Sequence, residues 1–123
     1  MPKYMMLIVE SEEAYAVTGA AEFAETMQNH ADFATAVTEA GASILSGEAL
    51  QPTATATYLR GTRTPDVHTI DNPLPELKEV VGGYYLVEAA DDATALELAK
   101  LCPAGFGHVE LRPVWEFGAG PAE

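Results

Sequence analysis

Residues 3–10 read KYMMLIVE, and this short run decides the fold class. The run is almost continuously apolar and rich in strand formers, which predicts a strand in the middle of a sheet. From residue 22 to residue 40 the apolar side chains return every three or four positions, and Gly41 stands where a helix would stop. The chain is therefore expected to open with a central strand and a long helix.

The middle of the chain changes character twice. The stretches SILSGEAL (43–50) and TATATYLR (53–60) predict a bent or paired strand region, because the second alternates small and larger residues and is rich in β-branched threonine. Residues 61–77 hold three prolines and a glycine, which predicts turns and loop around a short strand at 67–70. This irregular segment is a candidate binding loop.

The last third of the chain repeats the opening order. GGYYLVEA (82–89) predicts a strand, and ADDATALELAKL (90–101) predicts a helix that is capped by Asp91 or Asp92 and stopped by Pro103. HVELRPVWEF (108–117) predicts the closing strand.

The resulting order is strand, helix, strand region, strand, helix, strand. We expect a single domain over residues 1–117 and a flexible C-terminal tail over 118–123. Two right-handed crossovers would place both helices on one face of an antiparallel sheet, so the fold class is α+β: a ferredoxin-like βαββαβ sandwich with an additional strand or hairpin region. The other sheet face would stay wet in a monomer, which predicts a homodimer that buries it.

The charge of the chain excludes two classes of partner. Nineteen acidic and six basic residues give a net charge of −13, which repels phosphate backbones and anionic lipids, so neither nucleic acid nor membrane is expected as a partner. The longest apolar run, residues 4–9, is far shorter than the ~20 residues of a membrane span, and no basic segment precedes it. The single cysteine, Cys102, agrees with a reducing compartment. A cytoplasmic location is therefore predicted.

One histidine stands out on the first predicted helix. In TMQNHADFA (26–34), His30 shares the apolar stripe with Phe23, Met27, Ala34 and Val37, while the charged residues of the helix fall on the other side. Two interpretations remain open. The ring points into a cavity between helix and sheet, where modest burial shifts its pKa, or it is a core histidine satisfied by a carbonyl or a carboxylate.

Other polar residues are candidates for the same site. Asp71, Glu76 and Lys78 either line a pocket and orient a polar ligand or brace a proline-fixed loop. Glu48 either meets His30 as its orienting carboxylate or faces solvent, and Tyr84 is a further ligand-binding candidate. The remaining histidines have no ligand-like spacing to His30 or to the cysteine, so neither a metal nor another cofactor is expected.

The chain resembles the YCII-related family, in particular its DGPF-type branch, over residues 3–114. Four segments carry the resemblance: KYMMLIVE, the helix with His30 followed by Gly41 and SGEALQPTATAT, then DNPLPELKEVVGGYYLVE, and CPAGFGHVELRPV. Asn72 and Leu74 stand where the signature of the branch has Gly and Phe.

The resemblance implies both an assembly and a site. It implies a chain that pairs into a dimeric α/β barrel, and a helix histidine at the place of His30 that works with an aspartate just after the second helix. Cys102 stands at that aspartate position, which breaks the pair in this chain. A few relatives are lyase-type enzymes, and others are encoded beside or fused to extracytoplasmic-function sigma factors.

Two functions therefore remain as expectations. The first is a non-catalytic module that binds a small molecule near His30 or contacts a transcription component such as a sigma factor. The alternative is a cofactor-independent lyase, isomerase or hydrolase in which His30 is the general acid or base. An aspartate at position 102 would have favoured the enzyme, so its absence favours the binding module.

Overall fold

The computed structural model describes residues 1–70 and 79–117. Its main body is a four-stranded antiparallel sheet in the order β2-β5-β1-β6, with β1 in the interior as KYMMLIVE predicts. This order is that of the ferredoxin-like fold, which is confirmed. The strands of this sheet are β1 (Lys3–Glu10), β2 (Ser43–Ala49), β5 (Val80–Glu88) and β6 (Gly107–Pro113).

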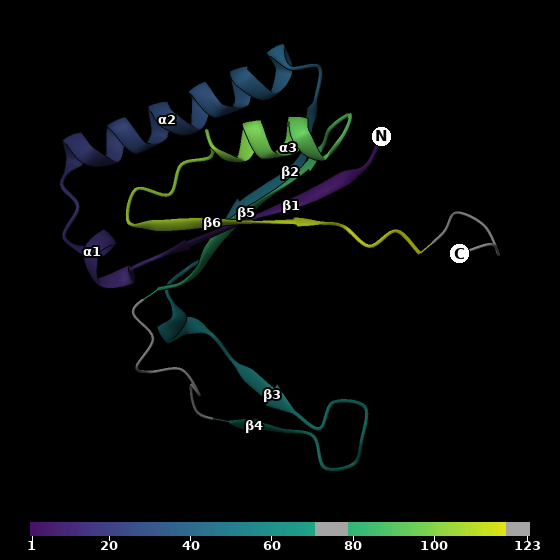
Figure 1. Cartoon of the computed structure of the whole chain (residues 1–123). Helices are drawn as coiled ribbons and strands as arrows, with labels where there is room; N and C mark the ends of the chain where they lie inside the picture. The colour runs from purple at the N-terminus through teal and green to yellow at the C-terminus, as the bar shows by residue number, and fades with distance from the viewer. Residues whose placement is uncertain (71–78, 118–123) are drawn as a thin grey trace.

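Two helices lie on the same side of this sheet, α2 (Ala20–Glu39) and α3 (Asp92–Ala99) (Figure 1). The core forms where they meet β1 and β5, and its largest fully buried side chains are Tyr4, Met6, Phe33, Val37 and Val87. Both helix ends that the sequence marks behave as expected. Asp91 caps α3 by accepting a hydrogen bond from the amide of Thr94 at 2.8 Å. Gly41 follows α2 with a φ of 76°, a conformation that favours glycine.

The segment between β1 and β5 departs from the expectation in two places. A short helix, α1 (Glu12–Ala16), precedes α2 and was not expected, although Ser11 caps it through the amide of Ala14. The bent or paired strand region predicted for residues 43–60 contains two strands, which lie in separate sheets. The stretch TATATYLR is strand only at its end. It forms a 3₁₀ turn, η1 (Thr53–Thr55), and then the three-residue strand β3 (Tyr58–Arg60). The threonines are drawn out of a ladder by local bonds, such as that from the Thr55 hydroxyl to the carbonyl of Pro52.

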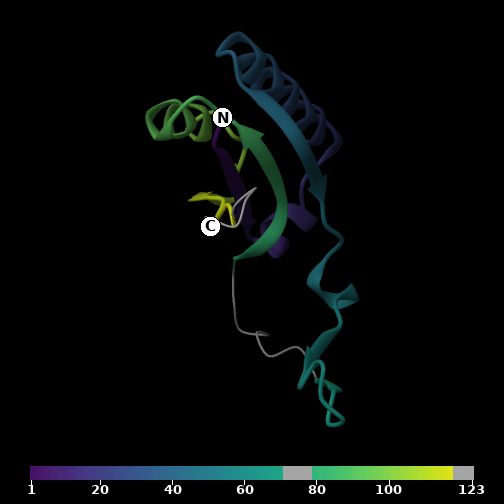
Figure 2. The same cartoon turned by 90° about the vertical axis from the view of Figure 1, so that its right-hand side faces the viewer.

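Strand β3 pairs antiparallel with β4 (His68–Ile70) in a separate two-stranded sheet. Figures 1 and 2 show this hairpin projecting away from the four-stranded body. It is the additional hairpin that the sequence predicts, and it leaves Leu59 and Val67 exposed.

The second face of the main sheet is apolar along its two middle strands, and the edge strands β2 and β6 add polar and charged side chains to it. Cross-strand pairs place Met5 and Leu7 of β1 beside Leu86 and Tyr84 of β5 on the face that points away from α2 and α3. In a single chain these side chains are half-buried. Within residues 1–70 and 79–117, no helix combines the length and the apolar character needed to cross a membrane.

Candidate functional site

A cavity of about 820 Å³ opens under the N-terminal half of α2. Its walls come from α1, α2, the adjoining ends of β1, β2 and β5, and the segment that follows β2. Most of the wall area is apolar, although many of the lining side chains also carry a polar group. Its side chains include Ile8, Glu10, Glu12, Glu13, Tyr15, Phe23, Met27, His30, Glu48, Leu50, Thr53, Val80, Tyr84 and Tyr85.

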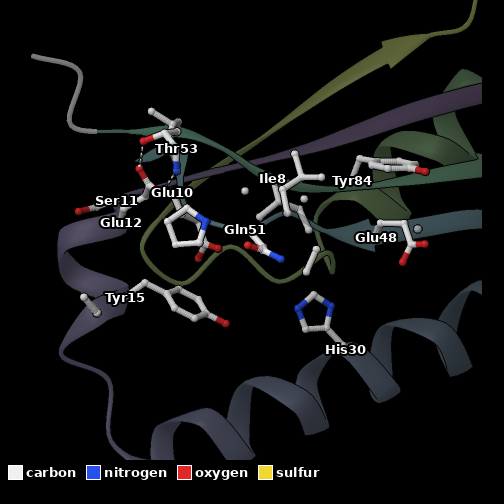
Figure 3. A pocket seen from close by; sticks show the side chains of 18 of the residues that line it. Ile8, Glu10, Ser11, Glu12, Tyr15, His30, Glu48, Gln51, Thr53 and Tyr84 are labelled. Atoms are coloured by element: carbon white, nitrogen blue, oxygen red, sulfur yellow. Dashed lines mark hydrogen bonds between the residues drawn. The ribbon is translucent and has the colours of Figure 1, made fainter. Parts of the chain in front are cut away.

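His30 lies in this cavity, half-buried, and points from α2 toward the strands (Figure 3). Its Nδ1 is 2.6 Å from the hydroxyl of Tyr85, and the two rings lie 5.8 Å apart between centroids. The Tyr85 ring also packs on the buried Phe33 at 4.8 Å. The structure therefore agrees with the first interpretation of His30, in which the ring points into a cavity. The role of the residue there is still a prediction.

The alternation of side chains along β5 places Tyr85 on the sheet face that His30 contacts. Tyr85 pairs with Met6 of the core, and its neighbour Tyr84 therefore faces the other side of the sheet. On the adjoining strand the partner of Tyr85 is Gly47. A Cβ at Gly47 would lie 2.6 Å from Cδ1 of Tyr85, so this glycine makes room for the ring.

Burial keeps both members of the pair neutral. Desolvation lowers the pKa of His30 below its ordinary value, and the negative charge of Glu10 opposes this shift in part. Burial raises the pKa of the Tyr85 phenol, with a smaller contribution from Cys102. At neutral pH an uncharged imidazole therefore contacts an uncharged phenol. If Nδ1 donates its proton to the Tyr85 oxygen, Nε2 carries the lone pair of a base; in the other tautomer, the phenol donates to Nδ1.

Glu10 is a site residue that the sequence analysis missed. It ends β1, lines the cavity, and its Oε2 accepts a hydrogen bond from the amide of Phe106 at 3.1 Å. Its charge acts on both His30 and Cys102. The signal available in the sequence was an acidic residue at the end of an apolar strand, which does not by itself predict a site.

Glu12 fixes the rim of the cavity. Its carboxylate accepts hydrogen bonds from the Thr53 amide at 2.7 Å and from the Thr53 hydroxyl at 2.5 Å (Figure 3). These two bonds tie α1 to the segment after β2, although the residues are 41 positions apart. The rim is therefore held by a charge-assisted double contact.

The structure describes two of the five other predicted site residues. Glu48 and Tyr84 both border the cavity, but they pair across β2 and β5 on the face opposite Tyr85. Of the two alternatives for Glu48, the structure has the exposed one. No hydrogen bond joins Glu48 to His30 in the described part of the chain, and Tyr85 contacts the ring instead. Asp71, Glu76 and Lys78 lie outside the described residues.

Cys102, at the position where the family resemblance implies an aspartate, is buried. Burial raises the pKa of its thiol to about 12, with a further contribution from Glu10, so it stays protonated at neutral pH and is not a nucleophile. Among the described residues, no three histidine, cysteine, aspartate or glutamate side chains gather as a metal site would need.

The apolar stripe of α2 is buried only in its C-terminal half. Phe33 and Val37 are buried, whereas Phe23 and Met27 are 52% and 53% exposed and Ala34 is exposed, so the apolar stripe predicted for this helix is only partly buried. The reason is that Phe23 and Met27 line the cavity rather than pack on the sheet.

The family model of the YCII-related domain matches residues 2–118 of the chain. No curated protein matches the chain.

Proposed function

The chain belongs to the YCII-related domain family, and on this premise we propose that it binds a small organic molecule in the cavity under α2. The observation that carries the proposal is the size and lining of this cavity. Its volume of about 820 Å³ lies within the range of about 300–1,000 Å³ that small-molecule sites have.

The polar groups of the cavity suit recognition. His30 and Tyr85 form a neutral hydrogen-bonded pair in a largely apolar wall, an arrangement that orients a ligand while the wall binds its body. The contact between Glu12 and Thr53 holds the rim of the cavity in place, and it does not involve His30 or Tyr85.

A fragment screen observed on the protein by NMR tests this function. Binders are expected to perturb the ring signals of His30 and Tyr85, with His30→Gln as the assignment control. Perturbations that gather elsewhere, on the β3–β4 hairpin for example, would contradict the cavity as the binding site.

A cofactor-independent lyase, isomerase or hydrolase is the second candidate. The lowered pKa of His30 favours it, because a neutral imidazole at physiological pH is ready to accept a proton. Turnover of a bound ligand, lost in His30→Gln while binding persists, would identify the enzyme; binding without turnover supports the binding module.

The candidate loop has its own test. If Asp71 and Lys78 contact the ligand, replacing either of them by Ala is expected to weaken ligand binding while the melting temperature stays within a few degrees. Loss of stability with unchanged binding would make the loop a structural brace. The membership in the DGPF-type branch rests on the sequence signature around these residues and stays part of the proposal.

A homodimer is proposed as the assembly, in the form of a dimeric α/β barrel. The apolar face with Met5, Leu7 and Leu86 supports it, because a second copy would bury side chains that one chain leaves half-exposed. Light scattering should give about twice the 13.1 kDa chain mass, and Leu7→Glu should reduce it to that of one chain. A monomeric wild-type protein at micromolar concentration would contradict the dimer.

A sigma-factor partner and a cytoplasmic location complete the proposal. The family resemblance supports the partner, and the single, buried and unpaired Cys102 agrees with a reducing compartment. To test this partner, a tagged chain is purified from the cells in which it naturally occurs, and the purified material is searched for a sigma factor. The same purification of the Leu7→Glu variant tells whether the partner needs the dimer.

A further inference from the structure

The charged side chains on the cavity wall have one sign. Within the described part of the chain four carboxylates line the cavity and no lysine or arginine does. The segment 71–78, outside the described residues, holds two acidic residues and one lysine, so its own charge is also negative. The carboxylates on the wall are Glu10, Glu12, Glu13 and Glu48.

Glu10 is the carboxylate best placed to contact a ligand. Glu12 is engaged by Thr53, and Glu13 and Glu48 are exposed. Glu10 is half-buried on the wall, and the amide of Phe106 holds its Oε2. Its other oxygen, Oε1, accepts no hydrogen bond among the described residues. A carboxylate that is fixed by one oxygen and open at the other is preorganised to accept a hydrogen bond from a cation.

The surroundings of Glu10 are compatible with a positive charge. His30 is uncharged at neutral pH because burial lowers its pKa, so it does not repel a cation. The apolar side chains of Ile8, Phe23 and Met27 stand on the same wall and offer contact for a hydrocarbon body. An anionic ligand would find four negative charges and no described positive one.

We propose that the ligand of this cavity is an organic cation, an amine or amidine on an apolar body, and that Glu10 binds its charged end. This inference rests on the proposed function and specifies its ligand class. The described walls of the cavity would repel carboxylates and phosphates, because like charges repel each other strongly in a partly desolvated site.

Matched compounds test the sign of the charge at constant shape. Benzylamine, benzyl alcohol and benzoate form one set, and hexylamine, hexanol and hexanoate form a second. Each is titrated into the protein at pH 7.5 while the ring signals of His30 and Tyr85 are followed by NMR. Each amine is expected to bind about tenfold more tightly than its alcohol, as one partly buried charge pair allows, and each carboxylate more weakly than the alcohol.

Two variants separate Glu10 from the overall charge of −13. Glu10→Gln removes the charge but keeps an oxygen for the Phe106 amide, so it should lower the amine affinity to that of the alcohol and leave the alcohol unchanged. Glu25→Gln makes the same change in net charge on an exposed residue of α2 that does not line the cavity. It should leave the order of affinities as in the wild type. Thermal unfolding of both variants checks that each is folded.

The outcomes distinguish this inference from the function beneath it. If compounds of both sets bind in the cavity but amine, alcohol and carboxylate bind equally, the cavity is a small-molecule site and the cation inference is overturned. The inference is equally overturned if Glu25→Gln weakens the amines as much as Glu10→Gln. If no compound perturbs His30 or Tyr85, the small-molecule function fails together with it.

Discussion

Replacing Gly47 by alanine should displace the Tyr85 ring and break its bond to His30. The added Cβ would lie 2.6 Å from Cδ1 of Tyr85, whereas ordinary contact begins near 3.4 Å, so the ring has to move by about 0.8 Å. A movement of that size away from the imidazole would lengthen the 2.6 Å hydrogen bond between the Tyr85 hydroxyl and His30 Nδ1 to about 3.4 Å, beyond the usual range of protein hydrogen bonds.

The expected loss of stability follows from two opposing contributions. Overpacking costs about 1–3 kcal/mol, and replacing a strand glycine by alanine recovers roughly 0.5–1 kcal/mol of backbone entropy. A net loss of about 1–2 kcal/mol is therefore expected, and urea unfolding measures it.

Gly82→Ala is the matched control. Gly82 lies in β5 and lines the same cavity, but a Cβ there meets nothing within 4 Å, so this variant should be neutral or slightly more stable. The NMR signals of His30 should move in Gly47→Ala and stay in place in Gly82→Ala. If the two variants unfold at the same urea concentration with the His30 signals unchanged, the argument that Gly47 positions Tyr85 is refuted.

Three further predictions concern single groups. Burial lowers the pKa of His30 in the folded chain, so the unfolded chain binds the proton more tightly. The folded state therefore has its full stability above about pH 6.5 and loses part of it as the pH falls through the lowered pKa. His30→Gln should therefore make the unfolding free energy fall less between pH 7.5 and 5.5, and an identical pH dependence would contradict it. The thiol of Cys102, buried and with its pKa raised to about 12, should not react with a thiol reagent at pH 8 until urea unfolds the chain. Asp91→Ala removes the cap of α3 and should cost about 1 kcal/mol in urea unfolding, whereas Asp91→Asn should cost little.

Features that depend on neighbouring residues could be predicted from the sequence. The apolar run at residues 3–10 makes an interior strand because only a buried place removes so many apolar side chains from water. Asp91 and Gly41 mark helix ends because a carboxylate near free amides, and a glycine at positive φ, act within one turn of the chain. The helix position of His30 near the sheet follows from the same local periodicity.

The composition of the site was decided by tertiary structure. Whether Tyr84 or Tyr85 faces the helices depends on how β5 pairs with β1, and a shift of one residue would exchange them. The proximity of Glu10 to His30, and the contact of Glu12 with Thr53, depend on how distant segments pack against each other. A local sequence pattern specifies which face of a helix or strand is apolar. The partners of a polar side chain depend on strand register and on the packing of distant segments, and a local pattern does not contain that information.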